Sequence, residues 1–247
     1  MVSGRRRGEY AALRAAFEDR FWWPEEQTYY FGLNGAKEPI RSVVSNAGHA
    51  LWSGIAAQQH AAAVVRRLLA PDMFSGWGIR TLSARHPAFN PFVYQLGSIW
   101  PHDNGLLALG FARYGFRDEA ARIAAGIFEA AQHYHSMPEL FAGLDRHPRD
   151  IPVQYLHANV PQGWAAGSVF MLLRALLGLR ADAPNKRLLV DPVLPAWLPR
   201  LRLSRLPVGD ATVDLEFVLD GSQTKTDVMD ITGDLRVVEE PLTPDPT

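Results

Sequence analysis

A single glutamate stands out as a group that could do acid or base chemistry. The run MPELFAG, residues 137–143, sets Glu139 between a proline and an apolar Leu-Phe pair, directly after the histidine-containing run QHYHS. A carboxylate among apolar neighbours has two interpretations: a solvated loop acid, or the working acid or base of an enzyme. A correctly placed base contributes about 10²–10⁴-fold to a reaction rate. The residue types alone leave both interpretations open.

Aromatic and polar side chains gather in the loops before and after Glu139. The runs concerned are SGWGIRTLS (75–83), NPFVYQLGSIWPHDN (90–104), MPELFAG and NVPQGWAAG (159–167), and each adjoins an expected helix. Loops repeated at one end of a helical scaffold are where binding and catalytic residues collect. A tryptophan face packs on the C–H face of a sugar ring, while Asp, Asn, Arg and His bond its hydroxyls. These loops therefore suit a polyhydroxylated ligand.

Each of these side chains also has a purely structural interpretation. Trp77, Trp100 and Trp164 are either core residues or platforms for a sugar ring, because buried tryptophan is common. Asp103 precedes the helical run GLLALGFARYG, so it either caps that helix or binds a sugar. His102 is either a satisfied structural histidine or a ligand contact. The sequence leaves these pairs open.

Other chemistries lack the residues that they need. His133 and His135 lie two apart on an expected helix and point to different faces, so they do not form a metal pair. The chain has no cysteine, no Gly-rich phosphate loop, no GxSxG elbow and no Rossmann fingerprint. We therefore expect neither a metal nor a cofactor. His49, in SNAGHALW, is expected at the start of a buried helix, and Arg80 is expected to pair with a carboxylate.

Composition limits the partners and the compartment. The 247 residues are 47% hydrophobic and 21% charged, with a formal net charge of −1, so nothing attracts nucleic acid or an anionic membrane. No apolar run approaches the length of about 20 residues that spans a bilayer. The first residues, MVSGRRRGEY, are charged but are not followed by an apolar signal segment. We expect a cytoplasmic protein.

Helical periodicity dominates the first two thirds of the chain. Apolar spacing predicts helices over residues 9–21, 48–69, 97–114, 117–135 and 163–177, and the last is apolar nearly all round, so we expect it to be buried. After Gly178 the period changes to the alternation of strands, at residues 188–190, 201–203 and 212–219. We expect a helical portion at 1–180, a short β segment packed on it at 181–220, and a polar, frayed tail at 221–247.

Five runs in this order resemble a known enzyme family: SNAGHALWSGI, GWGIRTLS, NPFVYQLGSIWPHDNGLLALGFARYG, MPELFAG and VPQGWAAGSVFMLL. They resemble the C-terminal half of the catalytic domain of bacterial glycogen-debranching-type amylo-alpha-1,6-glucosidases, over about residues 10–220. The resemblance implies a mainly α fold, a partial (α/α)6 barrel of the six-hairpin type with a small C-terminal β segment. It also implies hydrolysis of α-glucosidic bonds with inversion, by one carboxylic acid and one carboxylate.

The resemblance carries roles onto individual positions. The glutamate of PELF matches Glu139, whose implied role is the general base that activates water. The positions that match sugar-subsite motifs are Trp77 and Arg80 in GWGIR, Trp100, His102 and Asp103 in WPHDN, and Gln162 and Trp164 in PQGWAAG. The implied partner is an α-glucoside or oligosaccharide.

One part of the family pattern is missing. The family carries its general acid on an aspartate in a motif like NQGWKDS, upstream of the matched region, and this chain has no such motif. Asp103, Asp145 and Asp72 are its own candidates for a second carboxylate. The chain also contains too few helices for two rings of six. It resembles half an enzyme, so we expect it to be inactive alone and to self-associate or need a complementing chain. The alternative is a non-catalytic carbohydrate-binding or assembly half-barrel.

Overall fold

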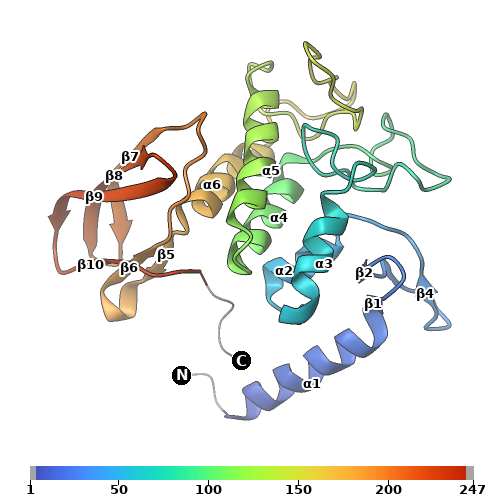
Figure 1. Ribbon diagram of the computed structural model, residues 1–247, viewed down its shortest axis with the longest axis horizontal. Helices are drawn as coiled ribbons and strands as arrows, with labels where there is room; N and C mark the ends of the chain where they lie inside the picture. Colours follow the sequence, from blue (N-terminus) through green and yellow to red (C-terminus); the bar gives the residue numbers. More distant parts are fainter. Residues whose placement is uncertain (1–3, 243–247) are drawn as a thin grey trace.

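The computed structural model describes residues 4–242. Five helices, α2 to α6, form the centre of the molecule, and the C-terminal strands lie to one side of them (Figure 1). The long loops between α3 and α4 and between α5 and α6 extend on the other side (Figure 1). The strands and the functional loops therefore occupy different sides of the helical core.

The helical core is organised around α4. The helices are α1 (Gly4–Phe21), α2 (Ala47–Ser53), α3 (Gln58–Leu68), α4 (Pro101–Arg113), α5 (Arg117–Ala131) and α6 (Gly163–Leu177). Helix α4 packs against α2, α5 and α6, and its Leu107, Ala108 and Phe111 are fully buried. Proline at its first position is compatible with a helix start, because that N–H has no partner within the helix. Helix α4 is consequently held in place by three neighbouring helices.

The Ala-rich run expected as one helix at 48–69 forms two. Helix α2 ends at Gly54, which has φ of 81° in the left-handed region and donates its N–H to Leu51 O. A residue without Cβ adopts this conformation without strain, so the chain turns here before α3 begins. Helix α6 differs from expectation too. Phe170 is 74% exposed and Trp164 is 51% exposed, so one face of this apolar helix is open.

Short strands follow α1. The first antiparallel pair is β1 (Trp22–Trp23) with β2 (Thr28–Tyr29), and the second is β3 (Gly32–Leu33) with β4 (Pro39–Ile40). Tyr29 is buried among the helices, and its hydroxyl donates to Glu18 at 2.7 Å. These pairs tie α1 to the rest of the core.

The C-terminal region is a pair of three-stranded sheets. One has the order β7 (Arg200–Val208), β8 (Ala211–Asp220), β9 (Gln223–Thr232), all antiparallel. The other has the order β10 (Arg236–Glu239), β6 (Arg187–Val190), β5 (Arg180–Asp182), with β10 parallel to β6; a 3₁₀ turn, η1 (Ala183–Asn185), joins β5 to β6. Val213, Leu215 and Phe217 of β8 are buried, as alternation predicts.

The expectation of a mainly α fold is wrong. Within residues 4–242 the structure has six α-helices and ten strands in four sheets, which makes it a mixed α/β fold. The residues after Gly221, expected as a frayed tail, form β9 and β10 as far as the described part extends; residues 243–247 lie outside it. The sequence QTKTDVMDIT of β9 lacks apolar alternation because most of its side chains are exposed. Its pairing with β8, rather than its own pattern, makes it a strand.

No helix in the described range is both long and apolar enough to cross a membrane.

Candidate functional site

Backbone pairing brings the four loops of the sequence analysis together. Isolated bridges link Arg80 to Ile99 and Ile99 to Phe141. The N–H of Glu139 donates to Asn159 O at 3.0 Å and so joins the fourth run. Ile99 and Phe141 exchange two backbone hydrogen bonds, at 2.9 and 3.0 Å. Loops from distant parts of the sequence therefore lie side by side at the N-terminal end of α4.

Close backbone approach explains the glycine that ends MPELFAG. A Cβ on Gly143 would lie 1.7 Å from Gly97 O, so any other residue would force the two loops apart. The Gly143 carbonyl also accepts a 2.6 Å hydrogen bond from Arg80 Nε. The position of Glu139 thus depends on contacts made four residues later in the same loop.

Glu139 is 3% exposed and is held by neutral donors. The hydroxyl of Tyr94 donates to its Oε1 at 2.5 Å. The backbone N–H and side-chain amide of Asn159 donate to its Oε2, at 3.3 and 3.1 Å. Glu139 is therefore a hydrogen-bonded carboxylate in a protected place, and the interpretation as a solvated loop acid does not fit.

Hydrogen bonding decides the ionisation of Glu139. Burial alone raises the pKa of a carboxyl group, and it is the largest single influence here. The hydrogen bonds from Tyr94, Asn159 and Gln162 together outweigh it, so the pKa of Glu139 lies below its ordinary value. The hydrogen bond between Tyr94 and Glu139 raises the pKa of Tyr94 to about 12. Glu139 is consequently ionised at neutral pH, which is the state that a general base requires.

A pocket of about 590 Å³ lies beside Glu139. Its walls come from α2, the first turn of α4, the start of α6 and the loops at 42–46, 81–86 and 94–96. Tyr94 lines this pocket and touches Glu139, which is not itself a wall residue. The volume falls in the range typical of small-molecule sites. We call this space the central pocket.

Two polar atoms of the central pocket have no partner among the described residues. His49 Nε2 lies 2.6 Å from Asp103 Oδ1, whereas Asp103 Oδ2 and His102 Nδ1 are buried without a hydrogen bond. A buried carboxylate oxygen left unpaired is costly, so a ligand or water is expected to supply its hydrogen bond. Asp103 makes no side-chain cap bond, and the N-cap position belongs to Trp100. Asp103 therefore does not cap helix α4, which was the structural interpretation of this residue.

Aromatic side chains form one wall of the central pocket. His102 and Trp164 are stacked, with ring centroids 4.6 Å apart, and Trp100 meets each ring edge-on. Burial is the largest influence on His102 and lowers its pKa; nearby His49 adds to this, while Asp103 and Glu139 oppose it. His102 is thus neutral at pH 7. Trp164 is half exposed, whereas Trp100 is 5% exposed and serves largely as core.

The structure separates Trp77 and Arg80 from this pocket. Trp77 is buried, carries Arg146 over its ring at 4.2 Å, and lines a different hollow with Asp145. Arg80 is 1% exposed and donates to Asp145 Oδ1 at 2.6 Å, which confirms the expected carboxylate partner. Both residues position the loops, and neither reaches the central pocket.

Gln162 lies between helix α6 and Glu139. It is the N-cap of α6, and its side-chain oxygen accepts from Gly163 N at 3.1 Å. Its side chain also contributes to the lowered pKa of Glu139. Gln162 therefore links the start of α6 to the carboxylate, although it does not line the central pocket.

Two of the three aspartates considered as a general acid are unsuitable. Partial burial raises the pKa of Asp72, but hydrogen bonds and charge from Arg67, together with Ser83 and Arg85, lower it overall. A strongly ionised carboxylate is a poor proton donor. Asp145 is bonded to Arg80 and lines the hollow beside Trp77 instead. Asp103 alone of the three lines the central pocket.

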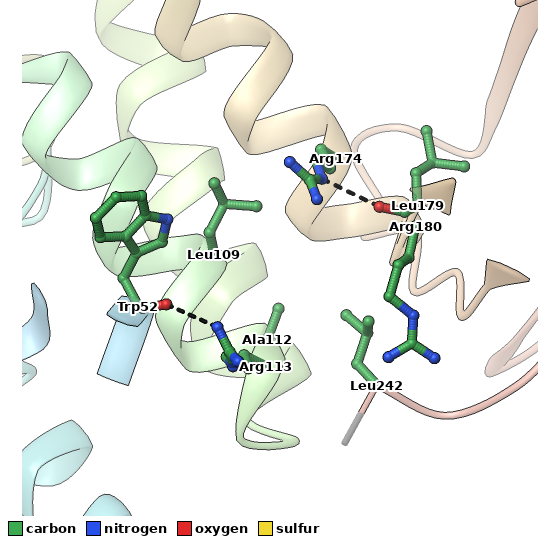
Figure 2. Close-up of a pocket in the computed structure, with 8 residues that line it drawn as sticks. All are labelled: Trp52, Leu109, Ala112, Arg113, Arg174, Leu179, Arg180 and Leu242. Atoms are coloured by element: carbon green, nitrogen blue, oxygen red, sulfur yellow. Dashed lines mark hydrogen bonds between the residues drawn. The ribbon is translucent and has the colours of Figure 1, made fainter. Parts of the chain in front are cut away.

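A second hollow lies at the opposite ends of α4 and α6, and we call it the arginine hollow. Trp52, Leu109, Arg113, Arg174, Arg180 and Leu242 are among the residues that line its volume of about 200 Å³ (Figure 2). Figure 2 shows Arg113 bonded to the carbonyl of Trp52 and Arg174 bonded to that of Leu179, at 3.1 Å each. These guanidinium groups satisfy carbonyls near helix ends, a structural task.

Sequence reasoning missed Tyr94 and Asn159 as contacts of Glu139. Both lie inside runs already noted for their composition, NPFVYQLG and NVPQGW. His49, expected to be structural, lines the central pocket and bonds Asp103. Tyrosine and asparagine are ordinary loop residues, so no local signal distinguished them.

Two solved structures, a sialidase and a neutral trehalase, share the fold. A sialidase aligns over 91% of this chain and 22% of its own, with a TM-score of 0.67 and 14% identity. Neutral trehalase Nth1 from Saccharomyces cerevisiae aligns over 66% of this chain and 29% of its own, with a TM-score of 0.52 and 17% identity. A mannosylglycerate hydrolase from Thermus thermophilus aligns over 62% of this chain and 34% of its own, with a TM-score of 0.48 and 22% identity. The chain therefore spans about a third or less of the length of these proteins.

A family model matches more than half of the chain. The match covers residues 4–143 and so includes Glu139 and the first turn of α4, and its description is a mannosylglycerate hydrolase MGH1-like glycoside hydrolase domain. The expected membership in a glycoside hydrolase family is confirmed, but the match does not identify a glycogen-debranching enzyme. The chain belongs to the MGH1-like glycoside hydrolase domain family.

Proposed function

We propose that this chain carries the general base and part of the sugar site of an inverting glycoside hydrolase. Glu139 is the base, and the central pocket holds the sugar whose bond is broken. The observation that carries the proposal is a buried carboxylate, kept ionised by neutral donors, beside a pocket with an unpaired carboxylate oxygen. Sugar hydroxyls supply the donors that such an oxygen lacks.

The residues of the central pocket suit separate tasks. Asp103 Oδ2 accepts a hydrogen bond from a sugar hydroxyl, and the neutral ring of His102 bonds another. The half-exposed ring of Trp164 packs on the C–H face of a sugar. Glu139 takes a proton from the water that attacks the anomeric carbon, while an acid protonates the leaving oxygen on the opposite face.

The general acid is the missing part of this mechanism. In inverting enzymes the two carboxyl groups lie about 6.5–9.5 Å apart, which leaves room for the water. Asp103 is the candidate of this chain that lines the central pocket, but it is bonded to His49 and is better suited to binding. We propose that the acid comes from residues beyond those described, from a partner chain or a longer form of the protein.

Two substrate classes follow from the two resemblances. The motifs favour an α-1,6-glucoside, and the family match favours a small mannoside such as mannosylglycerate. Both classes present a hexose to the central pocket and differ in the leaving group.

Product analysis tests the proposal directly. A protein in which this chain is joined by the acid, either a longer form or the chain with its partner, is incubated with a branched α-1,6-linked oligosaccharide and, separately, with mannosylglycerate. The purified chain alone, its mass in solution measured, should release no sugar. Proton NMR follows the anomer first released, with Glu139→Gln as the inactive reference. First release of the anomer opposite to that of the substrate supports an inverting enzyme, and the faster substrate identifies the class. First release of the same anomer contradicts inversion.

A non-catalytic carbohydrate-binding protein is the second candidate, favoured by the absence of the family's acid motif from this sequence. It predicts that oligosaccharides perturb the tryptophan fluorescence without any sugar being released. Loss of binding in Trp164→Ala, with no hydrolysis even by the longer form or the chain with its partner, would favour it over the enzyme.

A further inference from the structure

Asn159 contacts Glu139 through both main chain and side chain. The N–H of Glu139 donates to Asn159 O at 3.0 Å. In return, the N–H and the side-chain amide of Asn159 donate to Glu139 Oε2, at 3.3 and 3.1 Å. Three hydrogen bonds thus join two residues that are 20 positions apart in the sequence.

This reciprocal contact fixes more than the charge of the carboxylate. The bond from the Glu139 N–H fixes the main chain at residue 139, and the two bonds to Oε2 fix the direction of the side chain. Tyr94 holds Oε1 from the other side, so the carboxylate is fixed at both oxygens. A base must be held within a fraction of an ångström of its productive position to act on a bound water.

We propose that Asn159 is a positioning residue that orients Glu139 and keeps it ionised. The proposal rests on the role of Glu139 as the base. Asn159 itself is exposed, while Glu139 is buried, so the amide covers the carboxylate on the solvent side. It acts through Glu139 and does not touch the reacting atoms.

The direction of its effect follows from the charge on Glu139. Donors to the ionised form favour that form, and the pKa of Glu139 is lowered by these bonds despite burial. Removing the amide therefore raises this pKa. Because the folded-state pKa is the depressed one, the bonds stabilise the fold above the pKa of an unfolded glutamate. That contribution is lost as the pH falls through the folded-state pKa.

Carbon-13 NMR of the chain labelled at the glutamate carboxyl carbons measures the titration midpoint of Glu139, assigned with Glu139→Gln. We expect an upward shift of this midpoint in Asn159→Ala and an intermediate one in Asn159→Ser, which keeps a short donor. Asn185→Ala is the matched control, because Asn185 bonds Asp182, a carboxylate at the end of β5 far along the chain from Glu139. In Asn185→Ala, the titration midpoint of Glu139 should equal that in the wild type.

The wild-type protein supplies a second measurement, should a variant fail to fold. The side-chain amide signals of Asn159 should shift with pH at the same midpoint as the Glu139 carboxyl carbon. The proposal would be overturned if the Glu139 midpoint were unchanged in folded Asn159→Ala. It would also be overturned if the amide signals of wild-type Asn159 did not shift at the pH at which Glu139 titrates. Failure of the proposed function has a different signature: hydrolysis that persists in Glu139→Gln, with the Asn159 effect on the midpoint intact.

Discussion

The central pocket and the arginine hollow lie at opposite ends of the same two helices. In α4, His102 and Asp103 of the first turn line the central pocket, and Arg113 of the last turn lines the arginine hollow. In α6, Trp164 lines the central pocket and Arg174 lines the arginine hollow. Both hollows combine a tryptophan with charged side chains. They differ in the state of their polar groups.

Arginines of the arginine hollow bond backbone carbonyls, and Arg180 lies 3.5 Å from Glu240. In the central pocket one oxygen of Asp103 and one nitrogen of His102 remain without a partner among residues 4–242. Polar groups that are already satisfied belong to the architecture, whereas unsatisfied buried ones point to a ligand. The predictions below test this distinction, from the largest expected effect to the smallest.

Glu139→Gln should remove most hydrolysis in any active protein that contains this chain, by about 10²–10⁴-fold, because the amide cannot accept the proton. The amide keeps the shape, and its oxygen can still accept from Asn159, so the protein should remain folded, with a melting temperature lowered only by the part of these bonds that depends on the charge. Steady-state kinetics and thermal unfolding measure the two effects. Glu119→Gln, in the first turn of α5, is the control. Full activity in Glu139→Gln would place the base elsewhere.

Asp103→Asn should weaken the binding of a sugar to the central pocket by about ten- to a hundredfold, the contribution of a hydrogen bond to a charged group. Calorimetric titration of an oligosaccharide into the protein measures it. Asp118→Asn, also a first-turn acid but on α5, should bind as the wild type does. Equal affinity in both variants would mean that the unpaired oxygen of Asp103 meets only water.

Trp164→Ala should reduce the same affinity by about two- to tenfold, the range of an aromatic contact beyond its burial. Trp197 offers a matched control, because it is 43% exposed against 51% for Trp164 and packs on Phe128 outside the central pocket. Fluorescence titration of both variants with an oligosaccharide measures the two affinities. A larger loss in Trp197→Ala would refute the assignment of the sugar platform.

Arg174→Gln should leave sugar affinity unchanged and lower the free energy of unfolding by at most about 1 kcal/mol, the typical value of one hydrogen bond. Its bond to Leu179 O is exposed to solvent. Chemical denaturation and the calorimetric titration used for Asp103 provide both numbers. A pronounced change in sugar binding would show that the two hollows communicate through α6.

Local patterns predicted most of the helices and three strands, because the runs at 188–190, 201–203 and 212–219 fall within β6, β7 and β8. The spacing of Ala120, Ile123 and Ile127 predicts α5, and all three are buried. The alternation around Val213 predicts β8. These elements bury one face, so their apolar residues recur at the spacing of a helix or a strand and can be recognised in the sequence. Strands β9 and β10 were missed because they are defined by their partners: β9 is largely exposed, and β10 pairs in parallel with β6.

The sequence by itself determined which residue types the site contains, because the motifs around Glu139, Trp100 and Gln162 are contiguous runs. Only the tertiary structure decided which of them meet. Trp77 and Arg80 lie in a motif as suggestive as that of His102, yet they pack away from the central pocket. The physical reason is distance along the chain. His49 and Asp103 are 54 positions apart and Tyr94 and Glu139 are 45 apart, so helix packing and loop pairing, not local spacing, bring them within hydrogen-bond range.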